Sequence, residues 1–491
     1  MRYLLGIDIG TTSVKVGLVN ERGELEAIAI KEYSLLTSSD NRVECDVDIY
    51  WKNCKDGIRE VMGKSGVAPS SILAIGLSSQ GETFVCLDGE GKVLRRAIVW
   101  LDSRAYGEAD IVSKEIPLEV WYKKTGMPEM SPKWTICKIL WLKRNEPCIF
   151  ERTAKFLLLK DYLIWRLTGE IVTDPSVSSS TGYLDILNKE WWDEALNILE
   201  IGRDKLPEVL QSDEIAGRIG EAVGNELGLP AGIPVVNGGM DQMVDALGAG
   251  NVRPGIITET TGTALTIIAT THTPIFDPQR RIPCSPHCIP NTYVLMPYIE
   301  AAGILLRWFR DNFPSLKGIE GYEEMLSLAK SIPPGSDGLI AVPYFKGSLC
   351  PNYNPDASGA FVGITLNHGR AHFIRAIVEA VYFMLRENIE LLRSLSIPVE
   401  KVRSLGGASK SDIWLQIKAD VLNLPVETPM NSESAVFGAG ILAGIGCCIF
   451  SLDILDELVK IRKVFHPDPE ASLLYEKIYK NYQMIYKKLY G

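Results

Sequence analysis

The stretch LLGIDIGTTSVKVGLV, residues 4–19, determines how the rest of the chain is interpreted. Apolar residues before Asp8 and after Ser13 predict two short strands, and the polar segment between them predicts a tight turn at Gly10. The stretch therefore predicts a β-hairpin whose turn is the size of a phosphate group.

The chemistry of this turn suits a phosphate and its metal ion. Gly10 lets the backbone approach a ligand closely, and the amides and hydroxyls of residues 11–13 can donate hydrogen bonds to anionic oxygens. Asp8 has the charge that a phosphate-bound Mg²⁺ requires, and Lys15 adds a positive charge after the turn. An ordinary hairpin with a polar turn fits the same residues, so the interpretation needs support from elsewhere in the chain.

Composition restricts the class of protein. A chain of 491 residues with 46% hydrophobic and 23% charged residues predicts about two to four folded domains and no extensive disorder. The formal charge of −10 lacks the basic excess that binding to nucleic acid or to anionic membranes usually leaves. We therefore expect no nucleic-acid partner and no membrane association.

The ten cysteines form no paired CxxC framework, which favours reduced thiols in the cytoplasm. Cys284, His287 and Cys288 lie close together in the sequence, but a full tetrahedral ligand set is missing, so structural roles are preferred over a metal site. The N-terminus shows neither a signal peptide nor a segment of ~20 apolar residues that could span a bilayer. These features predict a cytoplasmic protein.

Polar residues follow a strand that is expected to be buried. The apolar run Ile72–Leu77 precedes Gln80, Gly81 and Glu82, and open α/β sheets build their sites just beyond the carboxyl ends of such strands. A solvated turn is the alternative for these residues. Further along the chain, Thr173–Asp185 is rich in Ser and Thr and predicts a loop that leads to a strand.

A second acid occupies a comparable position. The strand predicted at Ile233–Asn237 ends in Gly238 and Gly239, and a helix is expected to begin near Asp241. The Asp241 carboxylate could serve only as a helix cap, or it could face a ligand.

The second half of the chain repeats the opening pattern. Ile256–Ile268 again predicts a strand, a Thr/Gly turn and a strand, without an equivalent of Asp8. Such a repeat predicts two domains of one fold that face each other across a cleft. Later, a short strand at Val402–Leu405 runs into Gly406 and Gly407, where a flat base or ribose could lie against the backbone.

In their order, these parts resemble the FGGY carbohydrate kinases of the actin and ribonuclease-H-like ATPase superfamily, over nearly the whole chain. The matching stretches are Gly6–Ser13, Ile98–Arg104, Lys160–Leu163 with Leu167–Glu170, Gly238–Gln242, Gly262–Thr263, Asn354–Ile364 and Gly406–Ala408. The resemblance implies an α/β fold of two duplicated ribonuclease-H-like domains, of the actin and hexokinase type, around a central cleft. It places a sugar-binding domain at residues 1–252 and an ATP-binding domain at residues 253–491.

The resemblance also implies ATP and Mg²⁺ as cofactors and assigns site residues. It assigns nucleotide contacts to Asp8, Gly10, Thr11, Thr12, Ser13, Lys15, Thr261, Gly262, Thr263, Gly303, Gly406, Gly407 and Ala408. It assigns the sugar side to Gln80, Gly81, Glu82, Trp100, Asp102, Asp241 and Gln242. Asp241 is the expected general base, and Asp8 and Asp241 are the residues expected nearest to Mg²⁺.

The substrate is expected to be a small sugar phosphorylated on a primary hydroxyl. Xylulokinases carry Gln-Met-His where this chain has Gln80, Gly81 and Glu82, whereas glycerol kinases carry Gln-Arg-Glu followed by threonine. Residues 160–185 look more like xylulokinases, so a ketopentose such as xylulose is preferred, and glycerol or another polyol is the alternative. A homodimer is left open.

An actin-like assembly ATPase would contain similar hairpins and is the alternative from a different class. The polar set at Gln80, Glu82, Trp100 and Asp241 favours a kinase, because an assembly protein has no need of it.

Overall fold

Two sheets with the same pattern of parallel and antiparallel neighbours organise the molecule. The computed structural model describes residues 1–313, 322–348 and 350–491. The first sheet has the order β14-β15-β6-β1-β2-β3, and the second contains β19-β17-β16-β23-β24-β25, with β18 beside β19 and β20 beside β17. Across each sheet, a hairpin lies beside two strands that are parallel to its first strand, and an antiparallel strand forms the edge next to them. The duplication predicted from the sequence is therefore confirmed.

The strands of the first sheet are β1 (Tyr3–Ile9), β2 (Ser13–Asn20), β3 (Leu25–Glu32), β6 (Ile72–Ser79), β14 (Ile215–Arg218) and β15 (Pro234–Met240). Those of the second are β16 (Gly255–Thr261), β17 (Leu265–Thr271), β18 (Cys284–Pro286), β19 (Tyr293–Leu295), β20 (Tyr298–Ile299), β23 (Val399–Leu405), β24 (Val426–Pro429) and β25 (Ile461–Phe465). A smaller sheet contains β4 (Leu36–Thr37), β5 (Val43–Cys45), β7 (Phe84–Leu87), β8 (Ala97–Ile98) and β9 (Lys155–Leu158). Three short pairs are β10 (Val172–Thr173) with β13 (Glu208–Val209), β11 (Leu184–Asp185) with β12 (Glu190–Trp191), and β21 (Ile340–Val342) with β22 (Ala360–Val362).

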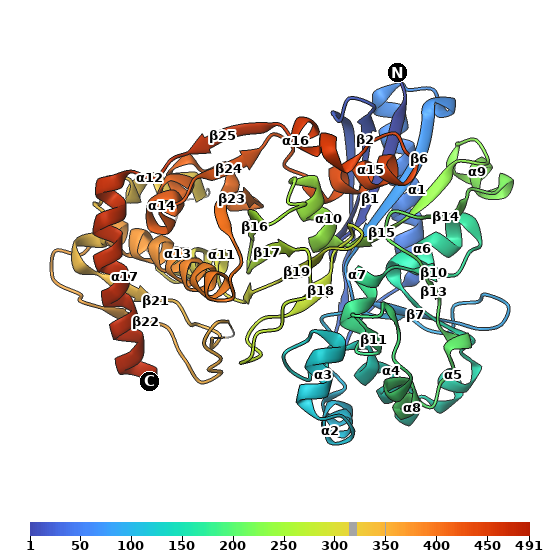
Figure 1. Cartoon of the computed structure of the whole chain (residues 1–491), viewed down its shortest axis with the longest axis horizontal. Helices are drawn as coiled ribbons and strands as arrows, with labels where there is room; N and C mark the ends of the chain where they lie inside the picture. Colours follow the sequence, from blue (N-terminus) through green and yellow to red (C-terminus); the bar gives the residue numbers. More distant parts are fainter. Residues whose placement is uncertain (314–321, 349) are drawn as a thin grey trace.

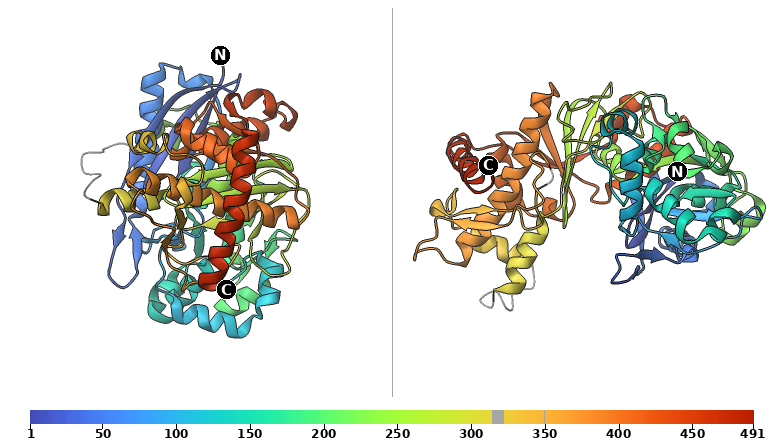
Figure 2. Two further views of the ribbon diagram at one scale, coloured as in Figure 1. Left: turned by 90° about the vertical axis from the view of Figure 1, so that its left-hand side faces the viewer. Right: turned by 90° about the horizontal axis from the view of Figure 1, so that it is seen from below.

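Helices surround these sheets. The first half of the chain contributes α1 (Val47–Ser65), α2 (Tyr106–Glu115), α3 (Leu118–Thr125), α4 (Thr135–Asn145), α5 (Pro147–Arg152), α6 (Leu159–Thr168), α7 (Pro175–Ser178), α8 (Asp193–Leu199), α9 (Glu221–Leu227) and α10 (Asp241–Gly248). The second half contributes α11 (Gly303–Asn312), α12 (Tyr322–Ala329), α13 (Arg370–Ser394), α14 (Asp412–Leu422), α15 (Ser434–Gly446), α16 (Leu455–Leu458) and α17 (Pro469–Tyr490). The two halves form two lobes (Figures 1 and 2), and α17 lies along the second lobe.

The opening hairpin forms as predicted. Strands β1 and β2 pair in an antiparallel register that sets Asp8 opposite Lys15, and β1 pairs in parallel with β6 so that Asp8 lies beside Ser78. Every residue of β1 after Tyr3 is buried, as expected for a strand at the centre of a sheet. The turn at Gly10 therefore projects from the rigid middle of the first lobe.

Helix α15 belongs to the second half of the sequence but packs on the first sheet. Gly6 of β1 and Gly76 of β6 contact its backbone so closely that an added Cβ would lie 2.0 Å from the carbonyl oxygen of Val436 or Ala439. On its other side, Gly438 approaches Val244 of α10 in the same way. Glycines thus let the backbone of α15 pack closely on both sides, and the helix joins the two lobes through α10.

The prediction that Thr173–Asp185 forms a loop is wrong. This segment forms α7, a 3-10 turn and β11, and all of its residues are buried. Asp174 caps α7 by accepting a bond from the Ser176 amide at 2.8 Å, and the Ser179 and Thr181 hydroxyls donate to carbonyl oxygens one turn earlier. The hydroxyl-rich composition therefore satisfies buried backbone groups instead of meeting water.

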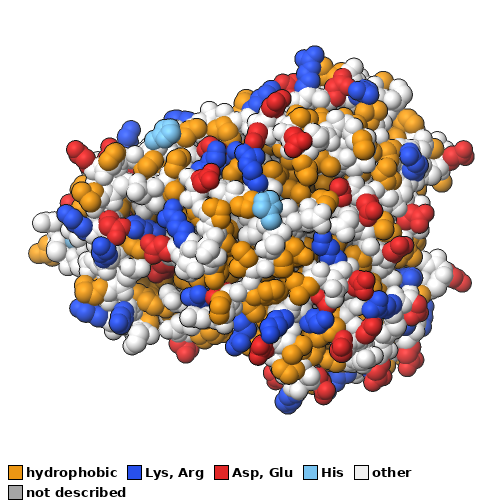
Figure 3. Space-filling view, in the orientation of Figure 1, with side chains coloured by type: hydrophobic (Ala, Val, Ile, Leu, Met, Phe, Trp, Pro, Cys, Tyr) orange, Lys and Arg blue, Asp and Glu red, His pale blue; other side chains and the backbone are white. Residues whose placement is uncertain are grey.

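Two further findings concern the surface. Acidic and basic side chains are interspersed over the face in Figure 3, without a broad basic area. Among the helices of the described residues, none is both long enough and apolar enough to cross a membrane.

The contact between α15 and the first sheet predicts a sharp effect of Gly76→Ala. A methyl group would collide with the Ala439 carbonyl, and overpacking of this kind typically lowers the free energy of unfolding by about 1–3 kcal/mol. Gly63→Ala on the exposed face of α1, where an added Cβ meets no atom within 4 Å, is the matched control. Urea unfolding of both variants provides the measurement, and equal stabilities would contradict the packing.

Candidate active site

Asp8 ends the first strand in a largely buried position. Its side chain is 5% exposed, and the Ser78 hydroxyl donates a hydrogen bond of 2.8 Å to its carboxylate. Burial raises the pKa of Asp8 to about 6, although the bond from Ser78 and the charge of Lys15 act in the opposite direction. The Asp8 carboxylate therefore gains from any additional cation that comes near it.

Asp241 is the first residue of α10 and lies close to Asp8. One oxygen of its carboxylate accepts a bond of 2.9 Å from the Gln242 amide. Burial and then the charge of Asp8 raise the pKa of Asp241 well above its usual value, and Glu82 and Asp245 act in the same direction. We call Asp8, Glu82, Asp241 and Asp245 the acid cluster, because the charges of the other three act on the Asp241 carboxylate.

The second hairpin reaches the same helix. Thr260 of β16 donates a hydrogen bond of 3.1 Å to Asp245, one turn after Asp241 in α10. The turn of this hairpin is supported by Gly303, whose amide donates to the Gly262 carbonyl at 3.0 Å. Gly262 and Thr263 are exposed, and although the Gly262 amide donates to the Ala264 carbonyl at 2.9 Å, the Thr263 amide and hydroxyl can face a ligand. Helix α10 thus connects both hairpins.

Thr261 points away from that exposed turn into a buried network. Its hydroxyl donates to Glu259, which also accepts bonds from Ser404 and from the fully buried Lys418. This network joins the second hairpin to the end of β23, and the sequence reasoning did not find Glu259 or Lys418. A charged residue within a strand or helix that is expected to be buried is unusual, and this was the signal that could have indicated Glu259 and Lys418.

Lys15 forms an ion pair that was not expected. Its ammonium lies 2.7 Å from the Glu433 carboxylate at the beginning of α15. Burial works against the charge of Lys15, but Glu433 and Asp8 together raise the pKa of its ammonium. The lysine stays charged beside the acid cluster and links the first hairpin to the beginning of α15.

Gln80, Gly81 and Glu82 are buried, so the alternative of a solvated turn is wrong for them. Glu82 has a left-handed backbone with φ of 52°, a conformation that is uncommon outside glycine. A Cβ added at Gly81 would lie 3.0 Å from the Ser180 hydroxyl and 3.1 Å from the Met240 methyl group. The segment is therefore held in a tight space directly beside the strand that leads to Asp241.

Trp100 connects the sugar side to the first hairpin. Its indole N–H donates a hydrogen bond of 2.9 Å to the Thr11 hydroxyl, and its backbone amide donates to the Thr83 hydroxyl at 3.0 Å. Thr11 is thus already engaged by the aromatic side chain, whereas Thr12 is exposed at the tip of the turn. Trp100 is therefore held by one hydrogen bond from its indole and one from its backbone.

Asp102 lies behind Trp100 and does not reach an open space. Its side chain is fully buried, and its oxygens accept bonds from the Val43 amide at 2.6 Å and from the Arg104 guanidinium. Lys138, also fully buried, donates to the Val99 and Trp100 carbonyls at 3.0 and 3.3 Å. Asp102 and Lys138 therefore support the loop that carries Trp100.

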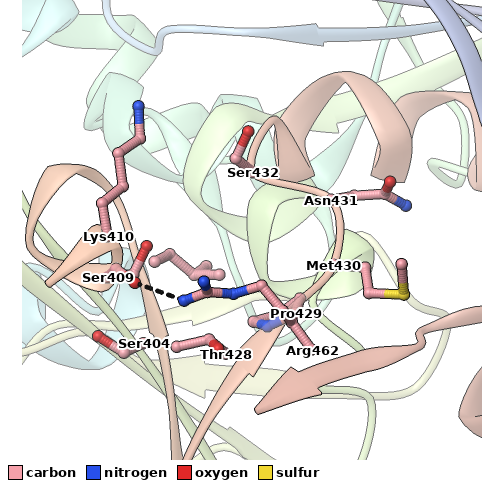
Figure 4. A pocket seen from close by; sticks show the side chains of 10 residues that line it. Ser404, Ser409, Lys410, Thr428, Pro429, Met430, Asn431, Ser432 and Arg462 are labelled. Atoms are coloured by element: carbon pink, nitrogen blue, oxygen red, sulfur yellow. Dashed lines mark hydrogen bonds between the residues drawn. The ribbon is translucent and has the colours of Figure 1, made fainter. Parts of the chain in front are cut away.

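A cavity of about 220 Å³ opens beside the glycines that follow β23. It is lined by Ser404, Leu405, Ser409, Lys410, Thr428, Pro429, Met430, Asn431, Ser432 and Arg462 (Figure 4). The Arg462 guanidinium closes one side by donating to the Ser409 carbonyl at 3.2 Å. Gly406 has φ of 73°, and a side chain there would meet the second hairpin at the Thr261 carbonyl.

Two comparisons of the sequence with known proteins agree with this geometry. Residues 3–248 match the N-terminal domain of the FGGY family of carbohydrate kinases, and residues 258–447 match its C-terminal domain. The chain belongs to the FGGY family of carbohydrate kinases. It is 31% identical to a xylulose kinase of Bacillus subtilis over 491 residues, which cover 99% of this chain and 97% of the relative. It is also 31% identical to a gluconokinase of the same organism, over 90% of this chain and 86% of that protein.

Solved structures of FGGY kinases have the same fold. The xylulose kinase from Rhodospirillum rubrum superposes with a TM-score of 0.92 at 28% identity, over 99% of both chains. The Plasmodium falciparum glycerol kinase with ADP superposes with a TM-score of 0.89 at 26% identity, over 98% of this chain and 97% of that one. The chain is therefore a sugar phosphotransferase with two domains of this fold.

Residues 428–432 and Arg462, which line part of the cavity beside β23, were not predicted from the sequence. Residues 428–432 lie at the end of β24 and just beyond it, so the rule that sites lie at the carboxyl ends of parallel strands could have indicated them, whereas Arg462 lies in the antiparallel edge strand β25. The strand was not recognised because Val426–Pro429 is only four residues long.

Cys284, His287 and Cys288 have structural roles in this FGGY kinase, as preferred from the sequence. The His287 ring donates to the Asn251 carbonyl at 3.2 Å and accepts a bond from the Cys288 amide, and burial lowers the pKa of His287 to about 4. Throughout the described ranges, no three His, Cys, Asp or Glu side chains come together as a metal site. All ten cysteines are described, and all are free thiols.

The acid cluster predicts how the pH profile responds to Asp245→Asn. Removing this negative charge lowers the pKa of Asp241. If Asp241 is the general base, it must be deprotonated to act, so the enzyme remains active at lower pH. We expect the acid limb of kcat/KM to move down by ~0.5–1 pH unit. Asp193→Asn, a change of an exposed acid at the start of α8, is the control and leaves the limb in place. A limb that moves to higher pH in Asp245→Asn would contradict the cluster.

Proposed function

We propose that this FGGY kinase transfers the terminal phosphoryl group of ATP to a primary hydroxyl of a small neutral sugar, and that a ketopentose such as xylulose is its substrate. One observation carries the proposal. Asp241 begins the helix that the second hairpin contacts through Thr260, and the charges of Asp8 on the phosphate side and Glu82 on the sugar side both act on its carboxylate. A base placed between two such sides can accept the proton of the attacking hydroxyl.

The electrostatics of Asp241 support the role of general base. A carboxylate at its ordinary pKa is a weak base at neutral pH, and a raised pKa brings it closer to the range in which proton transfer is efficient. A base of this kind typically contributes a factor of ~10²–10⁴ to the rate. The remaining requirements of phosphoryl transfer are alignment of the reactants and neutralisation of oxygen charge.

The nucleotide is assigned to the second lobe. The cavity beside Gly406, Gly407 and Ala408 has room for part of a base or ribose, and the exposed turn at Gly262 and Thr263 supplies donors for phosphate oxygens. Gly10, Thr12 and Ser13 of the first hairpin would face the transferred phosphoryl group from the other lobe. Approach of the two lobes would exclude water from the reacting atoms.

The donor set fits a magnesium ion that arrives with ATP. Asp8 and Asp241 are oxygen ligands whose pKa values are raised by burial first and by neighbouring acids second, and Lys15 is already paired with Glu433. Mg²⁺ usually keeps several waters and is held by one or two carboxylates together with substrate phosphates. When bound, the ion neutralises charge on the phosphate oxygens. Asp8 would hold it through water, and Asp241 would lie near it.

The charges on the sugar side favour a neutral sugar over an aldonate. Glu82 and Asp241 are both acidic, and a gluconate carboxylate would add a third negative charge beside them. Lys133 and Lys138 act on the pKa of Glu82, but the Lys138 ammonium is committed to two backbone carbonyls. The relatives include xylulose kinases, whose named substrate is neutral, and gluconokinases, whose named substrate is an aldonate. The acidic sugar side favours the neutral substrate, so xylulose is preferred for this chain.

The amide oxygens of this region favour a ligand rich in hydroxyl groups. Gln80 and Gln242 each bury a side-chain oxygen that has no hydrogen-bond partner. Such acceptors are normally satisfied, and sugar hydroxyls can donate to them whereas a carboxylate cannot. Gln80, Gly81, Glu82 and Gln242 are accordingly assigned to the substrate.

Glycerol or another polyol is the second candidate. Glu82 and the following Thr83 match glycerol kinases, but Gly81 replaces the arginine of that group. Ser180 and Met240 lie against Gly81, so the match to glycerol kinases is incomplete at this position. An actin-like assembly ATPase is disfavoured by the buried polar residues at Gln80 and Glu82, which polymer-coupled hydrolysis does not require.

We assign the enzyme to the cytoplasm, where ATP is abundant and the ten free thiols stay reduced. A homodimer remains a prediction from the sequence.

Asp241→Ala tests the assignment of the base. We expect kcat with xylulose to fall by ~10²–10⁴-fold because no other group takes the proton of the hydroxyl, while ATP binding persists. A coupled assay of ADP release, with and without sugar, provides the measurement.

Asp193→Ala is the matched control for Asp241→Ala, because Asp193 is likewise the first residue of a helix but is exposed on α8 and paired with Arg203. It should retain wild-type turnover. Sugar-dependent turnover near the wild-type rate in Asp241→Ala would remove Asp241 as the base. Equal ADP release with and without sugar in the wild type would favour the assembly ATPase.

A further inference from the structure

A group of fully buried polar side chains lies behind the strand that leads to Asp241. Lys160 and Asp161 are in α6, Asp174 and Ser176 are at the beginning of α7, and Asn237 is in β15. Each of them is 0% exposed, and Figure 1 shows α6 and α7 beside β15. We call these five residues the buried lysine cluster. Burying charges is expensive and often contributes little to stability, so the cluster calls for another explanation.

Lys160 holds an irregular point in strand β15. Its ammonium donates to the Asn237 carbonyl at 3.0 Å and to the Asn237 side-chain oxygen at 2.9 Å. At this point the pairing of β15 with β6 shifts register between Val236 and Gly239, and Gly238 has φ of 83°. Bulges of this kind redirect the residues that follow them. The lysine therefore fixes the direction in which the strand continues toward Asp241.

Ser176 holds the residue immediately before Asp241. Its hydroxyl accepts a hydrogen bond of 3.0 Å from the Met240 amide and donates its own proton to Asp174. The same Asp174 oxygen accepts bonds from the Ser176 amide and the Ser212 hydroxyl, both at 2.8 Å. The Ser176 hydroxyl is thus oriented by its acceptor and fixes the peptide on which α10 begins.

We call the bonds from Lys160 to Asn237 the lysine arm and the bonds of Ser176 to Met240 and Asp174 the serine arm. The two arms meet at the ammonium of Lys160. Its nitrogen lies 3.3 Å from one Asp161 oxygen and 3.4 Å from the second Asp174 oxygen. The other Asp161 oxygen accepts a bond from the Leu158 amide at 3.2 Å. Lys160 therefore ties the bulge, the serine arm and the beginning of α6 into one rigid unit.

We propose that Lys160 and Ser176 are positioning residues for the Asp241 carboxylate. This inference rests on the proposed function, in which Asp241 takes the proton of the attacking hydroxyl. The cluster is fully buried, so it acts by fixing where α10 begins. A displacement of about 1 Å can reduce the rate of an enzyme ~10²-fold, and small losses of alignment thus appear in kcat before they appear in binding.

Ser176→Ala tests the serine arm. It frees the Met240 amide, and we expect kcat to fall ~10-fold or more while KM for sugar and ATP stays within about twofold. ATP hydrolysis without sugar should be unchanged, because both hairpins remain intact.

Ser178→Ala is the matched control for Ser176→Ala. Ser178 lies in the same short helix, is also 0% exposed and shares a hydrogen bond of 2.9 Å with Thr173, but it does not contact β15. Its melting temperature should fall about as much as that of Ser176→Ala, with kcat unchanged.

A second variant tests the lysine arm without leaving an extra buried charge. Lys160→Met together with Asp161→Asn removes one positive and one negative charge, and the new amide can still accept the bond from the Leu158 amide. We expect the same loss of kcat with little change in KM.

Three outcomes distinguish the proposals. Loss of kcat in both cluster variants, at unchanged KM and with a normal Ser178→Ala control, supports positioning. A kcat for Ser176→Ala within twofold of Ser178→Ala overturns it, and so does a loss that only follows the folded fraction seen by circular dichroism. If Asp241→Ala is inactive in that case, the proposed function stands and only the positioning role fails.

Discussion

Burial of four carboxylates around one point is the constraint on which this site depends. Burial is the largest cause that raises the pKa of Asp8, Glu82, Asp241 and Asp245, and at Asp241 the charges of the other three raise it further. Within the described residues, the cation that faces Asp8 is Lys15, and Glu433 already pairs with it. Such a site is most stable when a ligand brings positive charge with it. A metal–nucleotide complex does so, and a sugar alone does not.

The duplicated fold explains how these acids come together. Each lobe presents one hairpin turn, and both turns reach helix α10, the first through the charges of the acid cluster and the second through Thr260 and Asp245. Helix α15 locks this arrangement from the other side, because glycines at Gly6, Gly76 and Gly438 let its backbone contact β1, β6 and α10. The base, the phosphate turns and the contact between lobes therefore depend on one pair of helices.

The sequence predicted the parts of the site that repeat or that follow long strands. The hairpin at Asp8, its repeat at Thr260–Thr263 and the helix beginning at Asp241 were predictable, because local pattern and turn chemistry specify them. The burial of Thr173–Asp185 was not predictable, since a Ser-rich segment looks like a loop until its hydroxyls are seen to bond with backbone. The same holds for Lys160, whose partner Asn237 is 77 residues away. Long-range satisfaction of buried polar groups leaves no local pattern.

The proposed reaction transfers phosphate from ATP to a primary hydroxyl of a neutral ketopentose. A decisive measurement is ³¹P NMR of the products formed from Mg²⁺–ATP with equal amounts of xylulose and gluconate. We expect one new phosphomonoester, on a primary carbon of xylulose, in one-to-one ratio with ADP. Phosphogluconate as the main product, or inorganic phosphate without any sugar ester, would contradict it.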